Sequence, residues 1–160
     1  MKHLKQLLVM AIFVCLCSSI HAQKIGPGLS YNLDGSLLGL GAQGLFSITE
    51  TIDIAPAATY YFTESIAGVS SSFILLEADG HYNFNISDKL TLHPIVGVAL
   101  GIVRASAGGI SASSSSFGLN LGGGAILNKD EKLSFFGKLK YTTAGGTGGL
   151  ALFAGAYFTL

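Results

Sequence analysis

The chain has 160 residues, of which 49% are hydrophobic and only 11% are charged, and its mean hydropathy is +0.56. The charged fraction is low for a soluble domain, in which about a quarter of the residues are charged. Nine basic residues balance nine acidic ones, so the composition gives no basic surface that would predict a nucleic-acid partner.

The N-terminus has the layout of a secretory signal peptide. Two lysines precede an apolar run over residues 7–16, and a short polar stretch ends at the small residue Ala22. The run is too short for a membrane-spanning helix, which needs about 20 apolar residues. We therefore predict a cleaved signal peptide over 1–22 and a mature domain over 23–160.

Both cysteines lie inside the predicted signal peptide. A lipoprotein would need a small residue immediately before the modified cysteine, whereas Val14 precedes Cys15 and Leu16 precedes Cys17. Lipidation is therefore not favoured. Without these two residues the mature chain has no cysteine, which excludes disulfides, thiolate catalysis and cysteine-based metal sites.

Alternation of apolar and other residues with a period of two predicts eight strands in the mature chain. In each strand one alternating set is apolar, and the segment 73–86 shows this most clearly, with Ile74, Leu76, Tyr82 and Phe84 on one face. The lengths suit tilted membrane strands of about 9–11 residues with some overhang. The predicted strands are 24–33, 37–48, 52–63, 73–86, 90–104, 117–127, 133–143 and 149–160.

The opposite faces carry the polar side chains. Segment 73–86 places Glu77, Asp79 and His81 on one face, and segment 133–143 contributes Lys138 and Lys140. Such residues would face water in a soluble sandwich and would fill the lumen in a membrane barrel, and alternation alone fits both. Other strands add Gln43, Asp53, Thr59, His93 and Asn120 to these faces.

The connections favour the membrane barrel. Short turns are predicted at 49–51, 87–89 and 128–132, and longer loops at 64–72, 105–116 and 144–148, with the short segment 34–36 as an exception. Outer-membrane barrels have short periplasmic turns and longer external loops, so this pattern places both mature termini in the periplasm. Gly and Ala crowd the inward faces, where they could accommodate large side chains in a narrow barrel. The expected fold is an all-β, eight-stranded antiparallel up-and-down transmembrane barrel.

In its pattern of strands, turns and loops, the mature chain resembles the small eight-stranded outer-membrane β-barrels of Gram-negative bacteria. This family has porin-like, adhesin-like and structural members. Family members usually end in an aromatic residue, whereas here Ala156 and Phe158 keep the alternation and the last residue is Leu160. The resemblance implies location in the outer membrane. It also implies outer-membrane lipid, the barrel-insertion machinery and periplasmic chaperones as partners. Aromatic girdles would include Tyr31, Tyr60, Tyr82 and Tyr141.

Few residues of the sequence are candidates for a catalytic or metal-binding site. Glu77, Asp79 and His81 could form a metal site or an acid–base group. We favour a structural lumen network in which these three residues pair with Lys138 and Lys140, because buried charges need partners. Accordingly, we assign no catalytic, cofactor or metal site.

Two other features of the sequence are not expected to form a catalytic or ligand-binding site. The serine runs at 70–72 and 113–116 are predicted to be flexible, solvated loops, and no histidine lies near them. The glycine-rich segment 118–124 opens no helix and is therefore not a phosphate-binding loop.

The sequence thus predicts a structural or surface-interaction barrel with a plugged polar lumen. A small porin-like barrel, or one that carries a ligand or lipid, is the alternative. A soluble lipocalin-like binding barrel and a membrane-barrel enzyme are less favoured.

Overall fold

The computed structural model of the chain describes residues 21–63, 70–108, 110–144 and 149–160. Most of the predicted signal peptide lies outside these residues, and cleavage after Ala22 stays a prediction. No helix in the described part of the chain has the length and apolar character needed to cross a membrane. The described strands are β1 (His21–Asn32), β2 (Leu37–Ser47), β3 (Ile52–Tyr61), β4 (Ser70–Tyr82), β5 (Phe84–Ser87), β6 (Leu90–Ala107), β7 (Ile110–Leu127), β8 (Leu133–Thr142) and β9 (Gly149–Thr159).

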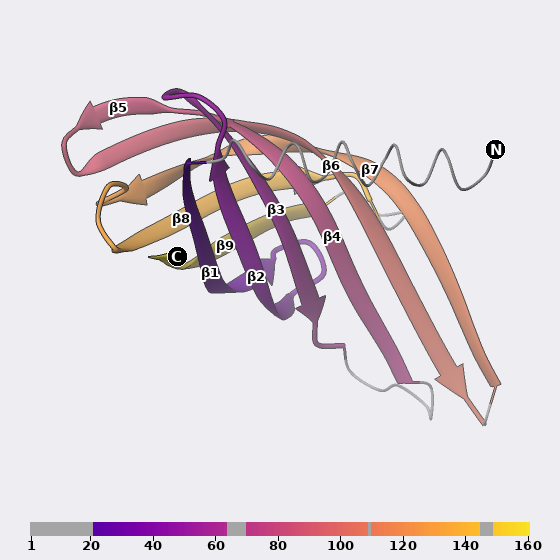
Figure 1. The fold of residues 1–160 in the computed structure, drawn as a ribbon. Helices are drawn as coiled ribbons and strands as arrows, with labels where there is room; N and C mark the ends of the chain where they lie inside the picture. Colours follow the sequence, from indigo (N-terminus) through magenta and orange to yellow (C-terminus); the bar gives the residue numbers. More distant parts are fainter. Residues whose placement is uncertain (1–20, 64–69, 109, 145–148) are drawn as a thin grey trace, which may run out of the picture.

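The strands form a closed antiparallel barrel (Figure 1). Apart from β4 and β5, neighbours in sequence pair with each other, and β1 pairs with β9. Both β4 and β5 pair with β6, so the two lie end to end along one strand position and the described barrel has eight strands around its wall. This confirms the predicted fold class.

The predicted strand 73–86 is interrupted at Asn83. The Asn83 backbone N–H donates to the Thr51 carbonyl oxygen at 2.7 Å, and its side-chain amide donates to Asp53 Oδ2 at 2.8 Å. Asn83 therefore bonds to the turn between β2 and β3 and separates β4 from β5. Alternation could not reveal this break because the residues on both sides keep the same phase.

The prediction of a loop at 105–116 is wrong. The prediction that the serine runs form flexible loops is wrong as well. Strands β6 and β7 continue as a paired ribbon as far as the Ala107–Ile110 pair, and the serines at 113–116 lie within β7. Gly108 has a φ of +56°, which suits glycine at the tight turn. Figure 1 shows this hairpin projecting beyond the ends of β1 and β2. We call this end of the barrel the hairpin end, and the opposite end, with the C-terminus, the C-terminal end.

The outward face of the barrel is apolar, in the phase that alternation predicts. Val96 and Leu121 are 67% and 69% exposed. The four predicted girdle tyrosines also point outward: Tyr82 lies near the C-terminal end of the barrel, and Tyr31, Tyr60 and Tyr141 lie near the hairpin end. A belt of apolar side chains between two rows of aromatic residues is the surface that a membrane barrel presents to lipid.

The interior is mixed, and apolar side chains occupy part of the lumen that the sequence predicts to be largely polar. An apolar cluster lies in the C-terminal half of the lumen, where Phe136 packs between Phe153 and Tyr157 with ring centroids 5.3 and 4.3 Å apart. These rings lie against glycines of adjacent strands. A Cβ on Gly26 would be 2.8 Å from the Tyr157 ring, and one on Gly28 would be 2.9 Å from the Phe153 ring. The inward glycines therefore make room for neighbours on the next strand.

Candidate functional site

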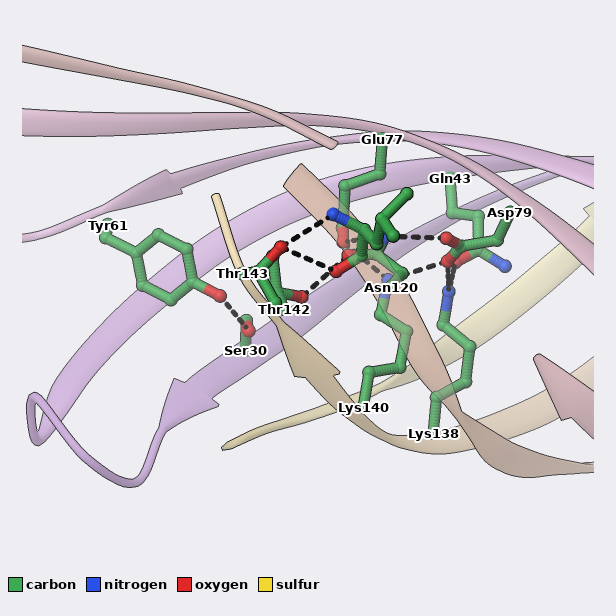
Figure 2. Close-up of polar contacts among 11 residues, drawn as sticks. Ser30, Gln43, Tyr61, Glu77, Asp79, Asn120, Lys138, Lys140, Thr142 and Thr143 are labelled. Atoms are coloured by element: carbon green, nitrogen blue, oxygen red, sulfur yellow. Dashed lines mark hydrogen bonds and ion pairs between the residues drawn. The ribbon is translucent and has the colours of Figure 1, made fainter. Parts of the chain in front are cut away.

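A network of ion pairs crosses the middle of the lumen (Figure 2). Lys140 Nζ, on β8, lies 2.6 Å from Glu77 Oε1 and 2.6 Å from Asp79 Oδ2, both on β4. Asn120, on β7, donates from its side-chain amide to Glu77 at 2.9 Å and to Asp79 at 2.7 Å. These strands are not neighbours of β4, so the contacts span the barrel. At 4%, 5% and 0% exposure, the side chains of Lys140, Glu77 and Asp79 are shielded from solvent.

Lys138 lies one layer nearer to the C-terminal end. Its Nζ is 3.6 Å from Asp79 Oδ2 and donates to the side-chain oxygen of Gln43, whose amide donates in turn to the Tyr157 hydroxyl. The ammonium also lies 5.3 Å from the centre of the Phe153 ring, within cation–π range. Lys138 and Lys140 together match the charges of Glu77 and Asp79, so the network is formally neutral.

His81 is inward-facing and buried, but the structure does not bring it into the ion-pair network. Its ring stacks on His93 of β6, with centroids 4.3 Å apart and an interplanar angle of 15°. The ring nitrogens of both histidines have no hydrogen-bond partner among the described residues. The structure thus places Glu77, Asp79, Lys138 and Lys140 together and puts His81 in a separate pair.

A second polar cluster lies at the C-terminal end of the lumen. Lys129, in the turn between β7 and β8, lies 2.8 Å from Asp53 Oδ2. Lys24 of β1 donates to the carbonyl oxygens of Lys129 and Glu131, the latter at 2.8 Å, and to the Ser134 hydroxyl at 3.0 Å. These contacts tie the turn across the barrel opening.

At the hairpin end, the residues that the structure describes leave a cavity in the lumen. Tyr61 and Ser30 share a hydrogen bond of 2.9 Å there, and Thr142 donates to Asn120 at 2.8 Å, which links this region to the central network (Figure 2). Beyond them lies a cavity of about 400 Å³. Its walls are mainly apolar, with Leu75 and Phe73 from β4 among the lining residues.

The arrangement pairs buried charges across the lumen. No group of three or more potential metal-ligating side chains occurs in the described ranges. Sequence reasoning placed Gln43, His93 and Asn120 inward without giving them partners, and it missed Tyr157. Alternation with the outward Phe158 indicates that Tyr157 points inward, but aromatic residues occur on both faces of these strands.

Comparisons with family models and with curated proteins find no match. Solved structures do match this chain. The N-terminal β-barrel domain of Pseudomonas aeruginosa OprF has a TM-score of 0.71 and 14% identity, covering 87% of this chain and 97% of that one. Neisserial surface protein A has a TM-score of 0.67 and 14% identity, covering 87% and 95%.

A third similar structure is Ail, the attachment invasion locus protein of Yersinia pestis, with a TM-score of 0.63, 18% identity and coverage of 87% and 97%. Ail has also been solved in complex with the heparin analogue sucrose octasulfate. At these identities the likeness concerns the fold. It confirms the predicted resemblance to the fold of small outer-membrane barrels.

Proposed function

We propose that this protein resides in the bacterial outer membrane as a structural or surface-interaction barrel whose lumen is plugged. The observation that carries the proposal is the buried network of Lys140 with Glu77 and Asp79, which crosses the lumen between strands that are not neighbours. An eight-stranded barrel has an interior just wide enough for side chains to fill. We expect the ion pairs in its centre to close the water path.

The apolar outward face supports the membrane location, because it would be unfavourable in water. The predicted signal peptide over 1–22 would deliver the chain to the periplasm, where chaperones and the insertion machinery would receive it. The short turns at 48–51, 88–89 and 128–132 lie at the C-terminal end, which we place in the periplasm. Cell fractionation tests this location, together with a gel on which the folded barrel migrates differently before and after boiling.

A planar-bilayer recording tests the plug. The wild-type barrel should show no steady conductance, whereas Lys140→Met should give at least intermittent openings. The matched control is Lys132→Met, in the exposed turn between β7 and β8, which should behave as wild type. Steady wild-type conductance would contradict the plugged lumen. A Lys140→Met barrel that stays as closed as the wild type would contradict the role of Lys140 in the plug.

We assign no catalytic role to the buried histidines. Neither His81 nor His93 hydrogen-bonds to a serine or a carboxylate of the described residues, and such a pairing is what activates a nucleophile. The interaction role draws on the likeness to Ail, but a sulfated ligand like the one in that structure is not proposed for the barrel mouth. The lining of the mouth contains Asp34 and no lysine, arginine or histidine.

A further inference from the structure

We propose that the cavity at the hairpin end is a binding site for a small amphipathic amine, with the apolar body of the ligand inside and its ammonium group at the rim. The proposal depends on the proposed plug in one respect, which is that the plug makes the cavity blind. A molecule that enters from the hairpin end is therefore held there and does not pass through.

The walls of the cavity are apolar at a position where an open lumen would be expected to be wet. Tyr61 and Phe73 stack with ring centroids 5.3 Å apart, and Tyr61, Leu75, Ala99 and Ala144 form a buried cluster. Leu37 packs against the same cluster. The volume of about 400 Å³ lies within the range of roughly 300–1,000 Å³ that is typical of small-molecule sites.

The floor is polar but already satisfied. The Tyr61 hydroxyl is paired with Ser30, and Thr142 donates to Asn120, which belongs to the central network. A ligand therefore gains little from the floor, and its body should be apolar. A flat aromatic ring suits the space beside the stacked rings of Tyr61 and Phe73.

The rim carries the charge that selects the ligand. Asp34, in the turn between β1 and β2, lines the cavity and accepts a hydrogen bond from the Leu150 backbone N–H at 2.6 Å. This contact fixes the carboxylate at the opening. Among the described residues no lysine, arginine or histidine forms an ion pair with it. A cationic group is thus favoured at the rim over an anionic one.

The test uses the full barrel in lipid nanodiscs with phenethylamine as the probe, and phenylpropionate as an anion of similar shape. Methyl NMR signals of Leu37, Leu75 and Val103 should shift and saturate with phenethylamine. The lipid-facing Leu119 and Leu121 report partition into the bilayer and should show no saturation. Phenylpropionate should bind more weakly. Unmoved cavity signals, or equal binding of the two probes, would overturn the site.

Two variants locate the site. Val103→Phe should fill the cavity from the β6 wall and weaken phenethylamine binding at least tenfold. The same substitution at Val98, which faces outward on the same strand with similar exposure, should leave binding unchanged. Asp34→Asn should weaken phenethylamine about two- to fivefold, as expected for an exposed ion pair, and should reduce the preference over phenylpropionate. Equal losses in the Val103 and Val98 variants would overturn the assignment.

Conductance and binding separate this inference from the proposed function. A barrel that does not conduct and does not bind the amine keeps its plug and loses the ligand site. A barrel that conducts steadily has lost the plug, whatever its affinity for the amine.

Discussion

Replacing Lys140 with methionine should destabilise the barrel by several kilocalories per mole. The Lys140 ammonium is the shared partner of two carboxylates, at 2.6 Å from each, and both carboxylates are at most 5% exposed. Without it Glu77 and Asp79 keep the Asn120 amide, and the nearest remaining cation is Lys138, 3.6 Å from Asp79. Breaking a buried ion pair by removing one partner costs about 3–5 kcal/mol. We expect a loss of that size in the free energy of unfolding.

Urea titration in lipid vesicles measures this loss. The chain has no tryptophan, so far-UV circular dichroism and heat-modifiable gel migration are the suitable signals. Lys132→Met removes the same charge from an exposed turn and should change the free energy of unfolding by no more than about 0.5 kcal/mol.

A double-mutant cycle refines the test, and recovery of folding in the double variant carries the same conclusion if Lys140→Met alone does not fold. Adding Glu77→Gln to Lys140→Met removes one of the two stranded charges and should restore part of the stability. We expect a coupling energy of about 1–3 kcal/mol between the two positions. A loss below about 1 kcal/mol for Lys140→Met, or strict additivity in the cycle, would refute the idea that these charges stabilise each other in the lumen.

Two further substitutions test the packing of the lumen and the lipid face. Gly122→Ala should cost about 1–3 kcal/mol in the same urea assay, because its Cβ would lie 2.2 Å from the Leu139 carbonyl oxygen. Gly123→Ala should be nearly neutral, since its nearest contact is at 3.6 Å; equal effects would contradict the close packing. Leu121→Arg, on the outward face, should cost about 2–4 kcal/mol in vesicles, and Leu127→Arg, near the C-terminal end, about 0–1 kcal/mol. Equal costs in vesicles would argue against a lipid belt centred near Leu121.

The faces of the strands could be predicted because alternation carries the necessary information. Where one face is apolar and the other is not, a slip by one residue would move every side chain to the wrong side. The serine-rich part of β7 gave no such contrast, since small residues occupy both of its faces. Its strand structure comes instead from backbone pairing with β6, from Ala107–Ile110 inward. Side-chain burial does not favour a strand in this segment, so a prediction based on alternating burial could not detect the strand.

The composition of the central network could be predicted, but its pairing could not. Strands β4 and β8 are separated around the barrel wall, so the distance between their side chains depends on strand tilt and stagger. These quantities place Lys140 against both carboxylates and Lys138 between Asp79 and Gln43. His81 contacts the adjacent strand instead: it stacks on His93 of β6, two residues from its paired residue Ile95.

The inward glycines explain why the charges lie where they do. Three of the lumen charges lie opposite a glycine on the adjacent strand: Asp79 pairs with Gly97, Lys140 with Gly122 and Lys138 with Gly124. A Cβ on Gly97 would be 2.4 Å from Asp79 Oδ1, and those on Gly122 and Gly124 would lie about 3 Å from the Cγ atoms of the lysines. The glycine-rich stretch of β7 therefore gives the lysine stems the room they need to cross the lumen. Because a side chain at any of these glycines would crowd the charged residue beside it, the proposed plug depends on the glycines as much as on the charged residues.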